Sequence, residues 1–147
     1  MKNILIAFTL FLFITCTKAK DYTAENEQEI LTYLSENNLT AQKTSSGLYY
    51  IIDNLGSGTQ AKSTDNVTVA YKGYFTNGSV FDQSDAAGIS FNLQQVIKGW
   101  TEGITYFKEG GNGVLLIPSS LAYGNNGQGS VPGGAVLIFD VKLISVN

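Results

Sequence analysis

Short stretches of alternating apolar and polar residues, separated by glycine-rich turns, constrain this chain to a fold built on β-strands. Successive side chains of a strand point to opposite faces of a sheet, so such alternation is typical of half-buried strands. Glycine contributes 16 of the 147 residues and charged residues only 14%, which favours a turn-rich fold over a helical bundle. The sequence therefore predicts a mainly antiparallel sheet, with strands at residues 48–52, 67–72, 114–117 and 136–144.

The second and the last of these strands carry the most informative patterns. Asn77-Gly78 follows the second strand and is a strong signal for a hairpin turn into Val80 and Phe81. The last strand is apolar on one face and mixed on the other. Its first face carries Leu137, Phe139, Val141 and Leu143, and its second carries Val136, Ile138 and Ile144 together with Asp140 and Lys142.

One convincing helix interrupts the strands. Trp100, Ile104 and Phe107 lie at positions i, i+4 and i+7, and Gly110-Gly111 is expected to end the helix. The predicted fold class is therefore α+β: a twisted antiparallel β-sheet wrapped around one short α-helix, with an extra N-terminal helix. A chain of 147 residues with 44% apolar residues has room for one core and short appendages.

The first residues have the pattern of an export signal. Lys2 precedes an apolar stretch at residues 4–14, which is shorter than the ~20 residues that a membrane-spanning helix needs. Phe13-Ile14-Thr15-Cys16 resembles a bacterial lipobox, whose cysteine becomes the lipid-modified first residue of the mature protein. The polar residues 17–21 offer nothing that would bury Cys16 as a structural cysteine. We therefore predict a signal peptide at residues 1–15 and a lipoprotein anchored to a membrane of the cell envelope, facing the periplasm or the surface.

A lipid-anchored N-terminal extension is expected at residues 16–45, with a helix at about 23–37. Thr23 is the expected cap, and Asn37-Asn38 the expected end. Ile30, Leu31, Tyr33 and Leu34 supply an apolar face. This helix could pack on the main domain, act as a spacer from the membrane, or mediate dimerisation; the pattern favours a spacer with partial packing.

Missing residue types exclude several function classes. The chain has no histidine, which excludes Ser-His-Asp and Cys-His nucleophile systems and the usual imidazole zinc ligands. It has no arginine, and an isoelectric point near 4.8 leaves no basic stripe for a phosphate backbone. We therefore predict no nucleic-acid partner, no metal site and no cofactor.

Four ordered blocks of the sequence resemble the FKBP family of prolyl isomerases. Residues 67–84 are similar to the family pattern VxYxGxxxxGxxFDxS, and residues 91–103 to FxL followed by VIxGWxEG. Residues 117–124 are similar to IPxxxAYG, and residues 131–141 to the closing block IPxxxxLxFxV. The chain departs from the family pattern in a short loop between Asp82 and Phe91, and at Ser130 and Gly133. These departures concern sequence preference and macrolide affinity more than isomerase activity.

The resemblance implies an FKBP-like isomerase domain at residues 46–147 with an aromatic proline pocket. It places Trp100 at the floor, and Asp82 and Tyr123 as polar groups, with Tyr123 and the Ile97 backbone N–H donating hydrogen bonds to substrate. The implied catalytic residues are Tyr71, Phe81, Asp82, Trp100, Tyr123 and Phe139, and the implied substrate-binding residues are Phe91, Val96, Ile97 and Val131. The implied partners are proline-containing polypeptides of exported proteins, with macrolide immunosuppressant-type compounds as further candidate ligands.

Two other interpretations stay open at this stage. Viewed singly, Trp100 in a stripe with Ile104 and Phe107 is ordinary core packing. The same cleft could also serve a binding module or assembly factor that holds a proline-containing segment without turnover. A chaperone role has less support, because no large inserted flap domain fits within the sequence.

Overall fold

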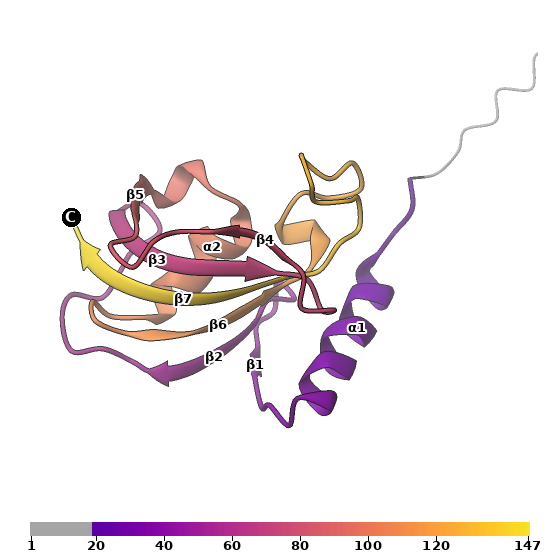
Figure 1. Ribbon diagram of the computed structural model, residues 1–147, viewed down its shortest axis with the longest axis horizontal. Helices are drawn as coiled ribbons and strands as arrows, with labels where there is room; N and C mark the ends of the chain where they lie inside the picture. The colour runs from indigo at the N-terminus through magenta and orange to yellow at the C-terminus, as the bar shows by residue number, and fades with distance from the viewer. Residues whose placement is uncertain (1–18) are drawn as a thin grey trace, which may run out of the picture.

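The computed structural model describes residues 19–147 of the chain (Figure 1). The predicted signal peptide and Cys16 lie outside these residues. Within the described part, no helix is both long enough and apolar enough to cross a membrane.

A single seven-stranded antiparallel sheet forms the centre of the fold, as the alternation predicts. The strand order is β1-β2-β6-β7-β3-β4, and β5 pairs with the same strand, β3, that pairs with β4. The strands are β1 (Gln42–Lys43), β2 (Tyr49–Asn54), β3 (Asn66–Tyr74), β4 (Val80–Gln83), β5 (Ile89–Asn92), β6 (Asn112–Ile117) and β7 (Leu137–Val146).

The two inner strands β6 and β7 are buried on both faces of the sheet over residues 115–117 and 137–139, whereas Asp140 and Lys142 of β7 are exposed. Leu115 and Ile117 point into the main core, whereas Leu116, between them, joins a second cluster on the opposite face. On β7, Phe139 points into the main core and Ile138 into the second cluster. This explains why residues 114–117 read as a continuous apolar run, since both faces of the strand are covered.

The hairpin predicted at Asn77-Gly78 is present between β3 and β4. Gly78 has a φ of +84°, in the left-handed region that glycine adopts readily. The neighbouring strand β5 was not predicted. It is four residues long and at most half-buried, so its sequence lacks the apolar alternation that marks the inner strands.

The helix that carries Trp100 packs directly on the sheet. It is α2 (Lys98–Gly103), followed by the short 3-10 helix η2 (Ile104–Tyr106). A Cβ atom at Gly99 would lie 2.4 Å from the Ile117 side chain, and one at Gly103 would lie 2.7 Å from Leu115. Only residues without side chains allow α2 to approach β6 this closely.

The predicted end of this helix at Gly110-Gly111 is wrong. Phe107 is fully buried, but it lies beyond η2 in an extended conformation. The Lys108 N–H donates to the Leu55 carbonyl at 2.8 Å, and residue 108 also forms an isolated bridge with Gln60. Pairing with this distant loop therefore ends the helical turns earlier than the apolar spacing indicates.

The predicted N-terminal helix is present as α1 (Thr23–Glu36). Its buried side chains Ile30 and Leu34 pack in the second cluster with Tyr49, Leu116 and Ile138. Figure 1 shows α1 beside the sheet and close to the β6–β7 connection. Of the alternatives for this helix, packing on the main domain is the arrangement that the structure contains.

The expected N-cap at Thr23 is wrong, because the N-cap lies one residue earlier. Tyr22 occupies the N-cap position, and its side chain makes no capping hydrogen bond. Instead, the Asp21 carboxylate accepts a hydrogen bond from the Thr23 N–H at 2.9 Å. At the other end, Asn37 terminates the helix as expected, and its side chain donates to the Tyr33 carbonyl at 2.8 Å.

We predict that Ile30→Ala will lower the free energy of unfolding by about 2–4 kcal/mol, because it leaves a cavity between α1 and the sheet. Leu31→Ala is the matched control, since Leu31 lies on the same helix with 43% of its surface exposed. It should change stability by less than about 0.5 kcal/mol. Urea unfolding of both variants measures the difference, and equal losses would show that α1 is not held by this face.

Candidate active site

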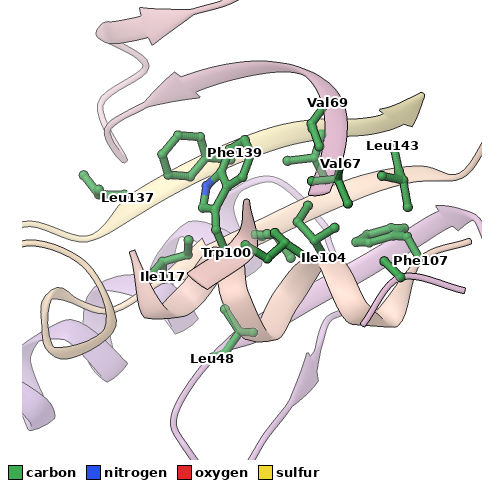
Figure 2. Close-up of a cluster of buried hydrophobic side chains, with 14 of the residues drawn as sticks. Leu48, Val67, Val69, Trp100, Ile104, Phe107, Ile117, Leu137, Phe139 and Leu143 are labelled. Atoms are coloured by element: carbon green, nitrogen blue, oxygen red, sulfur yellow. The ribbon is translucent and has the colours of Figure 1, made fainter. Parts of the chain in front are cut away.

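Trp100 lies at the centre of a cluster of aromatic rings. Its exposed fraction is 5%, and its ring meets Tyr71 at 5.1 Å, Phe139 at 5.2 Å and Phe91 at 5.3 Å between centroids, all edge to face. Figure 2 shows the indole and the Phe139 ring side by side above α2, at one end of the main core. Edge-to-face contacts orient aromatic rings more strictly than aliphatic packing does. Trp100 therefore helps to position the rings of Tyr71, Phe91 and Phe139.

The residue Gly73 makes room for two of these rings. It lies on β3, opposite Phe139 of β7 and Asp82 of β4. A Cβ atom there would come within 2.7 Å of both the Phe139 and the Phe81 rings. These two rings meet at 5.5 Å with an interplanar angle of 90°. The glycine thus allows strands β4 and β7 to present adjoining aromatic walls.

The backbone of Ile97 fixes the start of the tryptophan helix. Ile97 is the N-cap of α2, and its carbonyl accepts hydrogen bonds from the N–H groups of Trp100 at 2.9 Å and Thr101 at 3.1 Å. The Thr101 hydroxyl donates to the Leu93 carbonyl at 2.6 Å. These bonds hold the 3-10 turn before α2 against the helix, so Val96 and Ile97 keep a fixed place beside Trp100.

A polar pair lies at the edge of the aromatic cluster. The Tyr71 hydroxyl donates a hydrogen bond to the Asp82 carboxylate at 2.7 Å, across the β3–β4 pair. Burial raises the pKa of Tyr71 to about 12, and the bond to Asp82 adds to the shift. Tyr71 is therefore a neutral donor at physiological pH, and Asp82 holds its hydroxyl in one direction.

These side chains line a single cavity of about 470 Å³. This volume is in the range that binds small ligands or a few residues of a peptide. All ten pocket residues implied by the family resemblance, except Val131, line it. The full lining is Tyr71, Phe81, Asp82, Ile89, Phe91, Gln95, Val96, Ile97, Trp100, Tyr123, Gln128 and Phe139.

Val131 does not line the cavity. It is buried in the main core, and its backbone exchanges two hydrogen bonds of 2.9 Å with Gln128. Three lining residues were not predicted: Ile89, Gln95 and Gln128. They fall outside the quoted family motifs: Ile89 begins the short strand β5, Gln95 ends a 3-10 helix, and Gln128 lies in the β6–β7 connection, so no periodic pattern marks them. Val131 thus supports the position of Gln128, which itself reaches the cavity.

A second hollow, of about 710 Å³, lies between α1 and the turn at Thr76 and Asn77. Its lining includes three glutamates of α1 and only one aromatic residue, Tyr33. Within residues 19–147, no group of three or more acidic, histidine or cysteine side chains could hold a metal ion. The converging aromatic rings therefore single out the Trp100 cavity as the candidate active site.

Residues 57–144 match the family model described as FKBP-type peptidyl-prolyl cis-trans isomerase. The match spans β3 to β7 and contains the whole lining of the cavity. The chain belongs to this family. The expectation drawn from the four sequence blocks is thereby confirmed, as is the expected FKBP-like fold.

Curated relatives support the same family. The chain is 41% identical over 137 residues to the FKBP-type peptidyl-prolyl cis-trans isomerase FkpA of Aeromonas hydrophila, covering 90% of this chain and 51% of the relative. It is 46% identical over 107 residues to FkpA of Escherichia coli strain K12, covering 71% of this chain and 40% of that protein. This FKBP-type chain thus spans about half the length of the curated relatives that it matches, or less.

Solved structures share the fold. The crystal structure of FkpA from Escherichia coli superposes with a TM-score of 0.76 at 38% identity, covering 85% of this chain and 61% of that one. A peptidyl-prolyl cis-trans isomerase from Pseudomonas syringae gives a TM-score of 0.73 at 27% identity, covering 88% of this chain and 99% of the other. The second structure is thus matched over almost its full length.

We predict that Tyr71 titrates near pH 12 in the folded protein, above its ordinary value of 10.0. The raised pKa favours the neutral hydroxyl, so its stabilising effect is complete below pH 10 and disappears as the pH rises to about 12. Asp82→Asn should lower the midpoint but leave it above 10.0, because burial is the larger cause. NMR of ring-labelled tyrosine measures the titration midpoint, and the Tyr71→Phe variant assigns the signal. An unchanged midpoint in Asp82→Asn would disprove the role of Asp82.

Proposed function

We propose that this chain catalyses cis-trans isomerisation of X-Pro bonds in exported proteins, with the Trp100 cavity as its active site. The observation that carries the proposal is a network of five contacting aromatic rings that line one cavity in a chain of this family. The rings are those of Tyr71, Phe81, Phe91, Trp100 and Phe139. The domain proposed to carry the activity is residues 46–147.

The proposed mechanism needs no nucleophile. Rotation about a peptide bond is opposed by a barrier of about 18–20 kcal/mol, because resonance holds the amide planar. For an X-Pro bond, the cis and trans forms differ by only about 0.5–1 kcal/mol. An enzyme therefore has to stabilise the twisted amide and not a new covalent bond. The lack of histidine in this chain is compatible with such chemistry.

Aromatic walls suit both the binding of the proline ring and the stabilisation of the twisted amide. The proline ring is apolar and fills a pocket of aromatic faces, with Trp100 as the floor. The planar amide depends on a charge-separated resonance form, which is poorly stabilised away from water. Transfer of the bond into the Trp100 cavity therefore favours the twisted state over the planar one.

Polar groups at the edge would orient the peptide. Tyr123 is the proposed donor to a substrate carbonyl, and the Ile97 backbone N–H is the proposed second donor. The Asp82 carboxylate already accepts from Tyr71, so we assign it an orienting role and not that of a general base. Macrolide immunosuppressant-type compounds are proposed as further ligands of the same cavity.

We also propose that the chain is exported and anchored in the cell envelope through a lipid on Cys16. The support is the lipobox-like sequence and the apolar segment before it. Labelling of cells with a radioactive fatty acid should mark the wild-type protein and not Cys16→Ser. A labelled Cys16→Ser protein, or an unlabelled wild type, would exclude this anchor.

We predict that Tyr123→Phe will lower the catalysed rate on a short X-Pro peptide by about two- to tenfold, the value of one neutral hydrogen bond. Tyr106→Phe is the matched control, because its hydroxyl contacts Glu102 outside the cavity. The control should retain the wild-type rate. NMR exchange spectroscopy measures both, and equal rates for the two variants would remove Tyr123 from the site.

The same assay separates catalysis from simple binding. A wild-type protein that accelerates exchange above the uncatalysed rate supports the isomerase. A protein that binds the peptide, seen by the fluorescence of its one tryptophan, yet leaves the exchange rate unchanged would identify a binding module instead.

A further inference from the structure

The connection between β6 and β7 brings Tyr123 and Gln128 to the cavity. It covers residues 118–136, and its only helical segment is the short 3-10 helix η3 (Ser119–Leu121). Sheet pairing cannot hold such a segment in place. Its position must therefore come from other hydrogen bonds and from packing.

Gly124, the residue after Tyr123, links the two ends of this connection. Its N–H donates to the Ser119 carbonyl at 2.8 Å, and its carbonyl accepts from the Gly134 N–H at 2.8 Å. Tyr123 is thus fixed with respect to two points, Ser119 and Gly134.

The side chain of Asn26, on α1, joins the same two points. Its Nδ2 donates to the Gly134 carbonyl at 2.8 Å. Its Oδ1 accepts from the Ser119 N–H at 2.8 Å and from the Ser119 hydroxyl at 2.7 Å. Asn26 is 2% exposed, and a buried amide with such satisfied bonds holds its partners rigidly.

Two more contacts come from residues just before α1. The Tyr22 ring lies directly over Gly134, where a Cβ atom would come within 2.3 Å of the ring. The Asn125 side chain donates to the Lys20 carbonyl at 2.7 Å. All these contacts come from residues 20–26, which precede the part of the chain that matches the family model, residues 57–144.

We infer that Asn26 is a positioning residue, which makes peptide binding in the Trp100 cavity depend on α1. By bridging Ser119 and Gly134, it holds the connection in the form that presents Tyr123 to the ligand. The inference rests on the proposed function for the nature of the ligand. The inference goes beyond that function, because α1 does not line the Trp100 cavity and yet is assigned a role in shaping it.

The test compares Asn26→Ala with Leu34→Ala in the full chain. Leu34 is buried on the same helix, about two turns further from the β6–β7 connection, so its loss weakens α1 without removing the bridge. We expect Asn26→Ala to raise KM and lower kcat/KM for an X-Pro peptide by about tenfold, because small displacements of a contacting group lower rates strongly. Hydrogen exchange at Gly124 and Gly134 should become faster. Leu34→Ala should retain the wild-type kinetic constants and the wild-type hydrogen-exchange rates at Gly124 and Gly134.

Ser119→Ala keeps the test decisive if Asn26→Ala does not fold, because it removes only one of the three hydrogen bonds. It should shift KM in the same direction and by less. A folded Asn26→Ala protein with wild-type KM would overturn the inference, and so would an equal loss in Leu34→Ala, which would indicate general destabilisation.

The outcomes that would disprove the proposed function differ from those that would disprove the role of Asn26. If the wild type binds the peptide by Trp100 fluorescence but does not speed its isomerisation, catalysis is disproved, and the same variants decide the inference through their dissociation constants. If the wild type neither binds nor catalyses, both proposals are overturned.

Discussion

Burial of β6 and β7 on both faces over residues 115–117 and 137–139 is the constraint on which the rest of the structure depends. An antiparallel sheet commonly leaves one face to water, but here Leu116 and Ile138 point away from the main core and are still fully buried. The helix α1 covers them with Ile30 and Leu34. Each such side chain contributes about 1.5–3 kcal/mol when it leaves water. The N-terminal helix is therefore part of the folded unit, whatever further role the residues before it have.

The cavity is the end of the main core at which aliphatic packing gives way to aromatic rings. Leu115 and Ile117 fill the space beneath α2, and the missing side chains at Gly99 and Gly103 bring the helix down onto them. Trp100 then projects from the first turn of this helix into the cavity, where the rings of Tyr71, Phe91 and Phe139 pack around it. A rigid floor is thus a consequence of close helix–sheet packing, and the pocket needs no separate scaffold.

The sequence predicted the inner part of this arrangement and missed its edges, for physical reasons. Residues 114–117 form a continuous apolar run and residues 136–144 carry one fully apolar face, so both strands were predicted correctly. Phe107 kept helical spacing, but long-range pairing of Lys108 with Leu55 ended the helix, and no local pattern contains that partner. Most cavity residues followed from the family blocks, whereas Gln95 reaches the cavity from a three-residue 3-10 helix and Gln128 from the β6–β7 connection, neither of which has a periodic pattern. The bridge through Asn26 joins residues about a hundred positions apart, beyond the reach of any motif.

Neighbouring residues of β3 and β7 point to opposite faces of the sheet, one toward the cavity and the other toward the face that α1 covers. On β3, Gly73 receives the aromatic rings of the cavity, whereas Tyr74 points to the other face and donates to Asp140 at 2.9 Å. Burial, the Tyr33 hydroxyl of α1 and Asp140 together raise the pKa of Tyr74 well above its usual range. On β7, Phe139 and Asp140 are divided in the same way between the two layers. The sheet thus separates the aromatic layer from the layer that α1 covers, and the Asn26 side chain connects α1 to the β6–β7 connection directly.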